Sequence, residues 1–486
     1  MRDDEIMESH ANTSFLTRLG WSAEFSIEKG CEKNVEYERV MNRIIRMLGV
    51  DKAIRYVIFG KIISVLTGLL LIMLISHHLS KDAQGYYYTF NSVVALQIIF
   101  ELGLSTVIIQ FASHEMSALK YDYSERDIIG ESKNKQRYLS LFRLAIKWYA
   151  VIALLIILIV GPIGYVFFTQ KEGLGVPWQG AWLLLTIVTA FNIFLVSVLS
   201  VAEGSGLITD VNKMRMYQSL LAGILAVSLL ISGFGLYATS AIAISGTIIF
   251  SIFSYKYFKK IFLQSLKHKN KYTEGGISWV NEIFPMQWRI ALSWMSGYFI
   301  YFVMTPIAFK YFGAIYAGQL GMSLTLCNMV MATGLAWIST KYPKWGVMVS
   351  NKQLAELSKS FKSAVMQSSF FVLTGLTGVY ISLWLLKLSG SNIGERFLGL
   401  QDFFFLSLAI IGNHIVACFA TYIRAHKTEK MTLASCIMAL LTITTMLFVA
   451  YLEYSRFYML MYAALTWLYF VPQTYIIFKR FKSSYE

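Results

Sequence analysis

The residues of this sequence whose types could do chemistry are a few ionisable side chains inside long apolar segments. They are Lys61, Glu101, Lys310 and His414. A charged side chain at the centre of a lipid bilayer costs about 2.5–3.5 kcal/mol on insertion scales, so each such residue calls for a specific role. In membrane proteins these residues commonly mark the paths of substrates and ions.

Glu101 is the clearest of these candidates. It lies well inside its apolar segment, and Gln97 and Ser105 fall one helical turn to either side on the same face. We predict that Gln97 and Glu101 line a polar cavity, where the carboxylate binds substrate or couples transport to a proton or Na⁺. The alternative is a structural hydrogen bond between two helices. No other cofactor is expected.

Lys61 begins the first long apolar segment, shortly after Arg55. An ammonium group there could bind a phosphate as a point charge. Alternatively, its long side chain could extend to the lipid headgroups. The same two interpretations apply to Lys310, which ends its segment just after Pro306. We predict Lys61, Arg55 and Lys310 as substrate-binding residues.

Two further candidates are polar side chains inside apolar segments. His414 stands beside Asn413, and Asn91 lies near the start of its segment. Such groups either line a cavity or hydrogen-bond to a neighbouring helix, where each bond contributes about 0.6 kcal/mol. We predict His414 and Asn91 as substrate-binding residues and keep the structural alternative open.

The elements that must position these residues are membrane-spanning helices. Hydrophobic residues make up 56% of the 486-residue chain and charged residues only 15%, whereas soluble domains carry about 25% charge. Uncharged runs of about 20 residues are long enough to cross about 30 Å of hydrocarbon as helices. A membrane barrel would alternate apolar and polar residues, and these runs do not. We therefore predict an all-α polytopic membrane protein with about twelve spans, near residues 58–78, 86–111, 142–168, 180–202, 217–234, 236–258, 289–311, 315–340, 362–387, 401–423, 431–452 and 456–477.

The basic residues predict the orientation of these spans. If the N-terminus is cytoplasmic, nearly all of the 43 Lys and Arg residues flank the spans on the cytoplasmic side. The exceptions are Lys81, Lys171, Lys310, Lys387, Arg396 and Arg456. Positive residues accumulate in cytoplasmic loops, so we predict both termini in the cytoplasm. The same distribution argues against nucleic acid as a partner.

The chain divides into two similar parts. We predict a cytoplasmic tail and interfacial helix over residues 1–52, a six-span bundle over 53–260, a cytoplasmic linker over 261–288 and a second six-span bundle over 289–486. Residues 79–105 and 311–336 each contain a short turn, a glycine entering the next helix and a second glycine further on. Parallel six-span repeats of this kind are typical of transporters that bind substrate between their halves.

Several short motifs resemble one transporter family. They are Leu79–Ser80, Gly85–Tyr86, the acidic-Leu-Gly-Leu sequence from Glu101 to Leu104, and VAEGSGLI from Val201. These resemble the Wzx-type polysaccharide-biosynthesis flippases of the multidrug/oligosaccharidyl-lipid/polysaccharide exporter superfamily, over about residues 55 to 480. The N-terminal extension departs from that pattern.

The resemblance implies a flippase in the bacterial inner membrane. Its substrate would be undecaprenyl-pyrophosphate-linked oligosaccharide, an O-antigen, capsule or exopolysaccharide repeat unit. Besides membrane lipids, the implied partners are a polysaccharide polymerase and a chain-length regulator. Another exporter of the superfamily, acting on drugs or cations, is the main alternative. A membrane enzyme such as an O-antigen polymerase or glycosyltransferase is disfavoured by the short predicted external loops, so we do not expect an enzyme.

Overall fold

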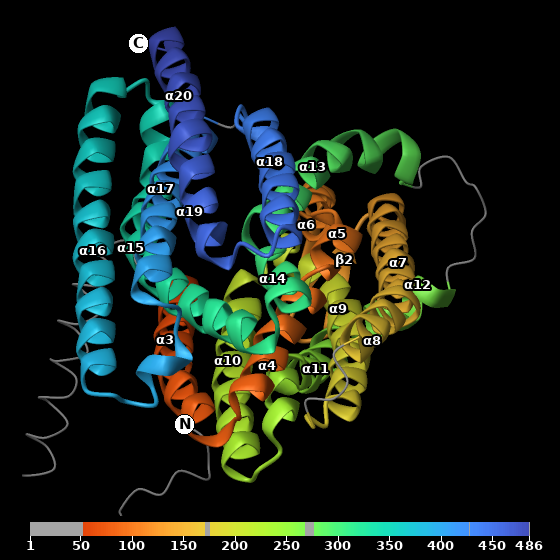
Figure 1. Ribbon diagram of the computed structural model, residues 1–486. Coiled ribbons are helices and arrows are strands. Elements are labelled where there is room, and N and C mark those ends of the chain that lie inside the picture. Colours follow the sequence, from red (N-terminus) through yellow and green to blue (C-terminus); the bar gives the residue numbers. More distant parts are fainter. Residues whose placement is uncertain (1–51, 171–174, 268–276, 427, 486) are drawn as a thin grey trace, which may run out of the picture. The chain divides into compact units, whose positions relative to one another are not determined.

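The computed structural model describes residues 52–170, 175–267, 277–426 and 428–485 (Figure 1). Eleven helices in this part of the chain are long and apolar enough to cross a membrane, and a bent helix pair gives a twelfth crossing. These crossings correspond one to one with the predicted spans. The prediction of an all-α polytopic membrane protein is therefore confirmed. The predicted interfacial helix lies largely outside the described residues.

Several crossings are made of more than one helical segment, because short π-helical or 3₁₀ turns interrupt them. In order, they are α3 (Lys52–His78); α4 (Lys81–Val94), α5 (Gln97–Glu101) and α6 (Leu104–Glu115); α7 (Ser132–Leu155), η2 (Ile156–Val160) and α8 (Gly161–Thr169); α9 (Gln179–Gly204); α10 (Ile208–Ile231); η3 (Gly235–Ser240), α11 (Ala241–Phe253), η4 (Ser254–Phe258) and α12 (Lys259–Lys267); η5 (Trp279–Ile283), α13 (Phe284–Tyr301) and α14 (Met304–Phe312); α15 (Ala314–Ser350); α16 (Leu354–Leu388); α17 (Leu400–Ala425); α18 (Thr432–Tyr451); and α19 (Ser455–Leu465), η7 (Thr466–Phe470) and α20 (Val471–Tyr485).

The second crossing is broken in its middle. Leu102 and Gly103 both have left-handed backbone conformations, with φ of 51° and 65°. The axis bends there by 43° between the α4–α5 and α6 parts. A side chain on Gly103 would overlap Ile290 and Trp294 of α13, so close packing as well as backbone conformation favours glycine.

A small β-hairpin that the sequence analysis did not predict joins α6 to α7. Its strands, β1 (Leu119–Asp122) and β2 (Asp127–Gly130), pair antiparallel with Leu119 opposite Gly130. Asp127 fixes the hairpin to its neighbours, because its carboxylate accepts from Lys135 and from Gln264 of α12, both at 3.0 Å.

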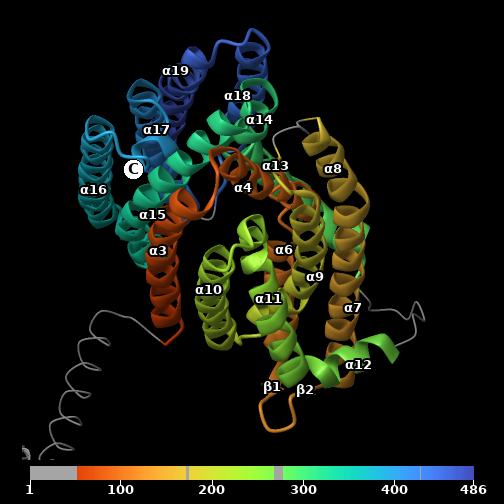
Figure 2. The same ribbon diagram turned by 60° about the horizontal axis from the view of Figure 1, so that its bottom comes forward.

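The crossings alternate in direction, so all connections lie at one of two ends (Figure 2). We call the end with the β-hairpin and the turns at 205–207 and 351–353 the hairpin end. The other, with the turns at 79–80, 232–234, 313 and 452–454 and the loop 389–399, is the Gly313 end. The chain enters the described bundle and leaves α20 at the hairpin end, as an even number of crossings requires.

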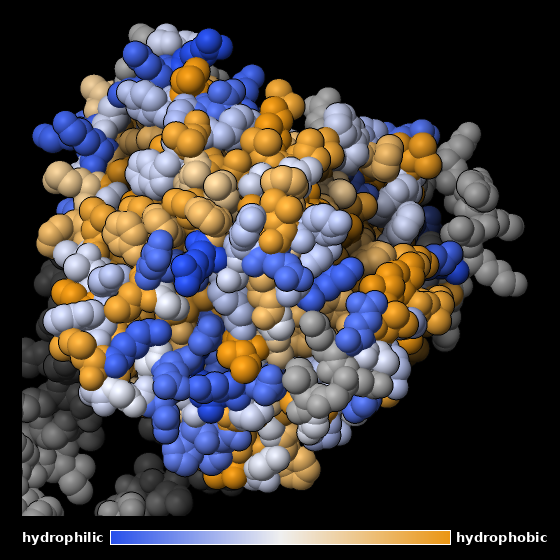
Figure 3. All heavy atoms as spheres, in the orientation of Figure 1, coloured by the Kyte–Doolittle hydropathy of each residue, from blue (hydrophilic) through white to orange (hydrophobic). Residues whose placement is uncertain are grey.

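Six crossings precede the gap at residues 268–276 and six follow it, and we call these sets the first and second halves. Within the first half α9 packs against α6 and α7, and within the second α15 packs against α16 and α17. The most extensive contact between the halves is that of α4 with α15. Figure 3 shows an apolar band on the face of Figure 1, with hydrophilic residues gathered above it at the C-terminal end of α20.

Candidate substrate cavity

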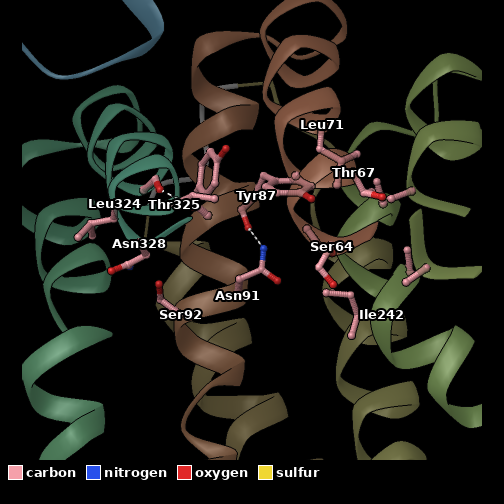
Figure 4. Close-up of a pocket in the computed structure, with 18 of the residues that line it drawn as sticks. Ser64, Thr67, Leu71, Tyr87, Asn91, Ser92, Ile242, Leu324, Thr325 and Asn328 are labelled. Carbon is pink, nitrogen blue, oxygen red and sulfur yellow. Dashed lines mark hydrogen bonds between the residues drawn. The ribbon is translucent and has the colours of Figure 1, made fainter. Parts of the chain in front are cut away.

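A central cavity of about 520 Å³ lies between the two halves (Figure 4). The first half contributes residues of α3, α4, α10, η3 and α11, and the second half residues of α13, α14 and α15. Hydroxyl and amide side chains dominate its polar surface. They are Ser64, Thr67, Tyr87, Tyr88, Asn91, Ser92, Gln218, Ser219, Thr239, Tyr301, Thr305, Thr325 and Asn328.

The lining of the central cavity carries no charge within the described part of the chain. Charged side chains stand one helical turn away, toward the hairpin end. Lys61 precedes Ser64 on α3, and Arg215 precedes Gln218 and Ser219 on α10. Residues three and four apart share a helix face, so both cations lie on faces that continue into the cavity. Both residues are exposed.

Arg215 was not among the predicted site residues. Its guanidinium Nη2 donates to Glu203 Oε2 at 2.7 Å, which leaves further N–H groups available. In the sequence it is one of the many basic residues that flank the spans on the predicted cytoplasmic side. Its spacing from Gln218 and Ser219 is the signal that could have identified it.

A second cavity, of about 1040 Å³, lies toward the hairpin end. It is lined by Ile98 of α5, Thr106 and Gln110 of α6, much of α13, Tyr342 of α15, and, around the connection between α17 and α18, Arg424, Thr428, Glu429 and Thr432. Tyr301 and Phe302 line both cavities, so the two adjoin at these residues. The predicted linker, which ends at Trp288, therefore ends at this second cavity.

At the Gly313 end the halves are joined by a cluster of polar contacts, which we call the latch. Arg396 Nη2 donates to the Leu79 carbonyl at 2.6 Å and Nη1 donates to Gln84 Oε1 at 3.3 Å. Gln84 Nε2 in turn donates to the carbonyls of Arg396 and Gly318, both at 2.9 Å.

An ion pair extends the latch. Lys81 of the first half pairs with Glu395 of the second half. Its ammonium group, through this hydrogen bond, holds the pKa of the Glu395 carboxyl below its ordinary value. Both side chains are substantially exposed, so the pair itself contributes little energy.

Two glycines allow the halves to approach this closely. A Cβ on Gly85 would overlap the Ala314 backbone, and one on Gly318 would crowd the Gly85 amide nitrogen. Backbone therefore packs directly on backbone where α4 crosses α15. Together with the latch, this contact joins the two halves on the side of the central cavity that faces the Gly313 end.

Comparison with solved structures identifies this arrangement. A MATE family multidrug resistance transporter of the MOP superfamily, in an inward-facing conformation, superposes with a TM-score of 0.57 at 12% identity, covering 87% of this chain and 98% of its own. The DinF-BH MATE multidrug transporter, solved in complex with a ligand, gives 0.59 at 14% identity over 90% and 95% of the two chains. The chain has the fold of these MATE transporters.

One further solved structure and two sequence comparisons add to this result. A MOP superfamily transporter from Pyrococcus furiosus, described as having a binding pocket of reversed polarity, matches with a TM-score of 0.51 at 13% identity over 91% of this chain and 98% of its own. No protein-family model matches the sequence. A short stretch of 33 residues is 94% identical to CDP-abequose synthase of Salmonella muenchen, but it spans only 7% of this chain and 11% of that enzyme.

Within the MATE fold, the predicted site residues are dispersed. Asn91 lines the central cavity, where its Nδ2 donates to the Tyr87 carbonyl at 3.0 Å (Figure 4). Lys61 stands one turn from that cavity. Arg55, at the start of α3, lines neither cavity.

Gln97 and Glu101 lie on α5 and line neither of these two cavities. Glu101 Oε1 instead accepts from the Tyr149 hydroxyl of α7 at 3.0 Å. Ser105 and Ser200 also interact with that hydroxyl. The carboxylate therefore belongs to a polar cluster inside the first half, directly before the helix break.

Lys310 and His414 lie apart from both cavities. Lys310 is exposed near the Gly313 end, with its Nζ 5.5 Å from the centre of the Tyr311 ring. His414 is buried in the second half, where its Nε2 lies 2.7 Å from Ser368 Oγ of α16. This geometry is that of the structural alternative, a hydrogen bond between neighbouring helices.

Proposed function

We propose that this chain flips a lipid-linked oligosaccharide across the bacterial inner membrane by alternating access. The observation that carries the proposal is the central cavity, whose described lining is uncharged, carries many hydroxyl and amide groups, and comes from both halves of a MATE fold. Hydroxyl and amide groups can exchange hydrogen bonds with a neutral polyhydroxylated ligand as its water is removed. A cationic ligand would find no carboxylate in the described lining.

The three chemical parts of such a substrate match three parts of the molecule. The sugars would occupy the space between the halves. The pyrophosphate would bind Lys61 and Arg215, because a guanidinium offers paired donors to phosphate oxygens and an ammonium adds a point charge. The polyprenyl chain would stay in the lipid along α3, which exposes Phe59, Leu66 and Met73.

The direction of transport follows from the predicted topology. The hairpin end holds most of the basic residues and would face the cytoplasm. The latch at the Gly313 end would then close the cavity to the outside, and opening it would release the substrate there.

The near-identical stretch shared with CDP-abequose synthase supports a link to nucleotide-sugar chemistry.

Transport against a gradient needs an energy source, and we assign coupling to a proton or Na⁺ at Glu101. Its carboxylate lies next to the helix break and is bonded to Tyr149, so a change in its charge would act on the α5–α6 junction. Glu101→Ala should then abolish transport while preserving protein level, and normal display of surface polysaccharide in that variant would remove Glu101 from the mechanism.

The decisive experiment deletes the gene and locates the lipid-linked repeat unit. Accumulation in the inner leaflet is expected, whereas unpolymerised units on the outer leaflet would indicate a polymerase. Lys61→Ala and Arg215→Ala should each reduce flipping about tenfold or more, because each removes a charged contact to the pyrophosphate. Lys213→Ala is the matched control, since Lys213 lies on α10 near Arg215 but its Nζ points over the Tyr217 ring.

A drug or cation exporter is the second candidate function, because this chain shares its fold with multidrug transporters. It predicts that overproduction protects cells from cationic drugs and that deletion leaves the repeat unit correctly placed. Flipping of the repeat unit without any drug resistance would exclude it.

A further inference from the structure

The second cavity has a lining distinct from that of the central cavity. Along α13, Trp294, Tyr298 and Tyr301 are spaced four and three residues apart and so form one aromatic stripe. Trp294 is 41% exposed although it packs against the helix break at Gly103. Across the cavity, Tyr342 of α15 is 39% exposed. Two large aromatic side chains therefore present open surface from different helices.

Polar groups complete the lining beside these rings. Gln110 of α6 is exposed and brings an amide from the first half. Arg424 Nε donates to Glu429 Oε2 at 2.7 Å, and the Tyr342 hydroxyl donates to the Arg424 carbonyl at 3.3 Å. The charges of Arg424 and Glu429 cancel, so the cavity offers many hydrogen-bonding groups without a net charge.

We propose that this second cavity is a loading site for the sugar part of the substrate, in which Trp294 and Tyr342 stack on sugar rings. The inference rests on the proposed function and adds a subsite to it. The C–H face of a sugar ring is weakly positive and packs against the negative face of an aromatic ring. The hydroxyl groups at the ring edge would bond to Gln110, Arg424 and Glu429.

The lining disfavours other classes of ligand at this site. A purely apolar ligand would remove water from Arg424 and Glu429 without replacing its hydrogen bonds, which is costly. A pyrophosphate would meet the carboxylate of Glu429. The cavity is also about twice the size of the central one, and drug-sized pockets span about 300–1,000 Å³. It can therefore receive several sugar units before one enters the smaller space beyond Tyr301.

Interfacial anchoring is the usual reason for exposed tryptophan in membrane proteins. Trp384 of α16 illustrates that case, since it is 46% exposed and lines neither cavity. Trp294 differs because its exposed surface lies within a cavity formed by both halves. Trp384 therefore serves as the matched control for Trp294.

The test measures binding of the free sugar to the purified full-length protein in lipid nanodiscs. The probe is the host strain's own repeat-unit oligosaccharide, released from its lipid carrier by mild acid, and binding is followed by calorimetry. Trp294→Ala and Tyr342→Ala should each raise the Kd about fivefold to tenfold. Trp294→Phe should retain most of the affinity, and Trp384→Ala should match the wild type.

Each outcome decides the inference. An unchanged Kd in Trp294→Ala and Tyr342→Ala, or no binding of the sugar to the wild-type protein, overturns it. If Trp294→Ala does not fold, Tyr342→Ala gives the decision alone, since Tyr342 does not pack at the helix break. Normal flipping in the leaflet assay together with absent sugar binding would reject this subsite while leaving the proposed function intact.

Discussion

Removal of the Arg396 side chain should shift the protein toward a state that is open at the Gly313 end. In the structure this guanidinium crosses between the halves, donating to the Leu79 carbonyl at 2.6 Å and to Gln84 Oε1 at 3.3 Å. Arg396→Ala deletes both bonds but retains the backbone carbonyl that accepts from Gln84. The change therefore weakens the latch without removing it.

The size of the shift follows from the two bonds. A hydrogen bond from a charged donor contributes about 1.5–3 kcal/mol, and the longer bond contributes less than the shorter one. Because Arg396 is only half-buried, we take about 2 kcal/mol for the pair together. At 1.4 kcal/mol for each factor of ten, this corresponds to an about 30-fold change in the ratio of open to closed molecules.

Distances between spin labels report this ratio directly. Labels on cysteines at Ser232 and Glu453, which are exposed in the two halves at the Gly313 end, would be placed in a background without the native cysteines. The wild type should show mainly the short distance, and Arg396→Ala should add a population at longer distance. Arg456→Ala, an exposed cation at the same end, is the control. Identical distributions in Arg396→Ala and wild type would refute the assignment of the latch.

Three other perturbations test the same structure. Gly85→Leu should force α4 away from α15, populate the open state and slow flipping; closed-state distances and normal transport would contradict this. Arg137→Ala should lower the unfolding free energy by about 2 kcal/mol in a thermal or denaturant melt, because it removes the guanidinium that pairs with both the buried Glu115 and Glu282, and an unchanged melt would show that these two pairs contribute nothing. Because the pKa of Glu395 is lowered by Lys81, the contribution of the pair is fully present at neutral pH and is lost as the pH falls below 4.5; since both side chains are exposed, acid should add only a small population at longer spin-label distance, and a large shift would contradict this.

The sequence was sufficient to predict the helices and their alternation. The length of an apolar run indicates whether a segment can cross the lipid, and the basic residues beside it indicate its orientation. Lipid and headgroups act on each segment separately, so these predictions do not require knowledge of which helices it packs against. The hairpin at 119–130 was missed because its short strands lie in a polar loop and are fixed by Lys135 and by Gln264 of a distant helix. Such contacts arise only after the chain has folded.

The candidate site was less predictable for a related reason. Glu101 and His414 were predicted because they lie far inside apolar segments. Position within a segment does not indicate which neighbouring helix a side chain contacts. The structure turns Glu101 toward Tyr149 and His414 toward Ser368. Asn91 lines the central cavity. Arg215, which the sequence does not distinguish from other basic residues of the loops, lies one helical turn from that cavity. Helix-face reasoning applied to α10 would have found Arg215.

The break at Leu102 and Gly103 separates two parts of the second crossing that pack against different halves of the protein. Its α4 part is packed against α15 of the opposite half, whereas its α6 part is packed against α9 of its own. A straight helix in this position would have to break its contacts with either α15 or α9 if the two halves moved apart. A flexible joint at Leu102 and Gly103 would let α4 and α6 each keep its own contacts. The rearrangement would then be confined to these two residues, whose backbone is already left-handed.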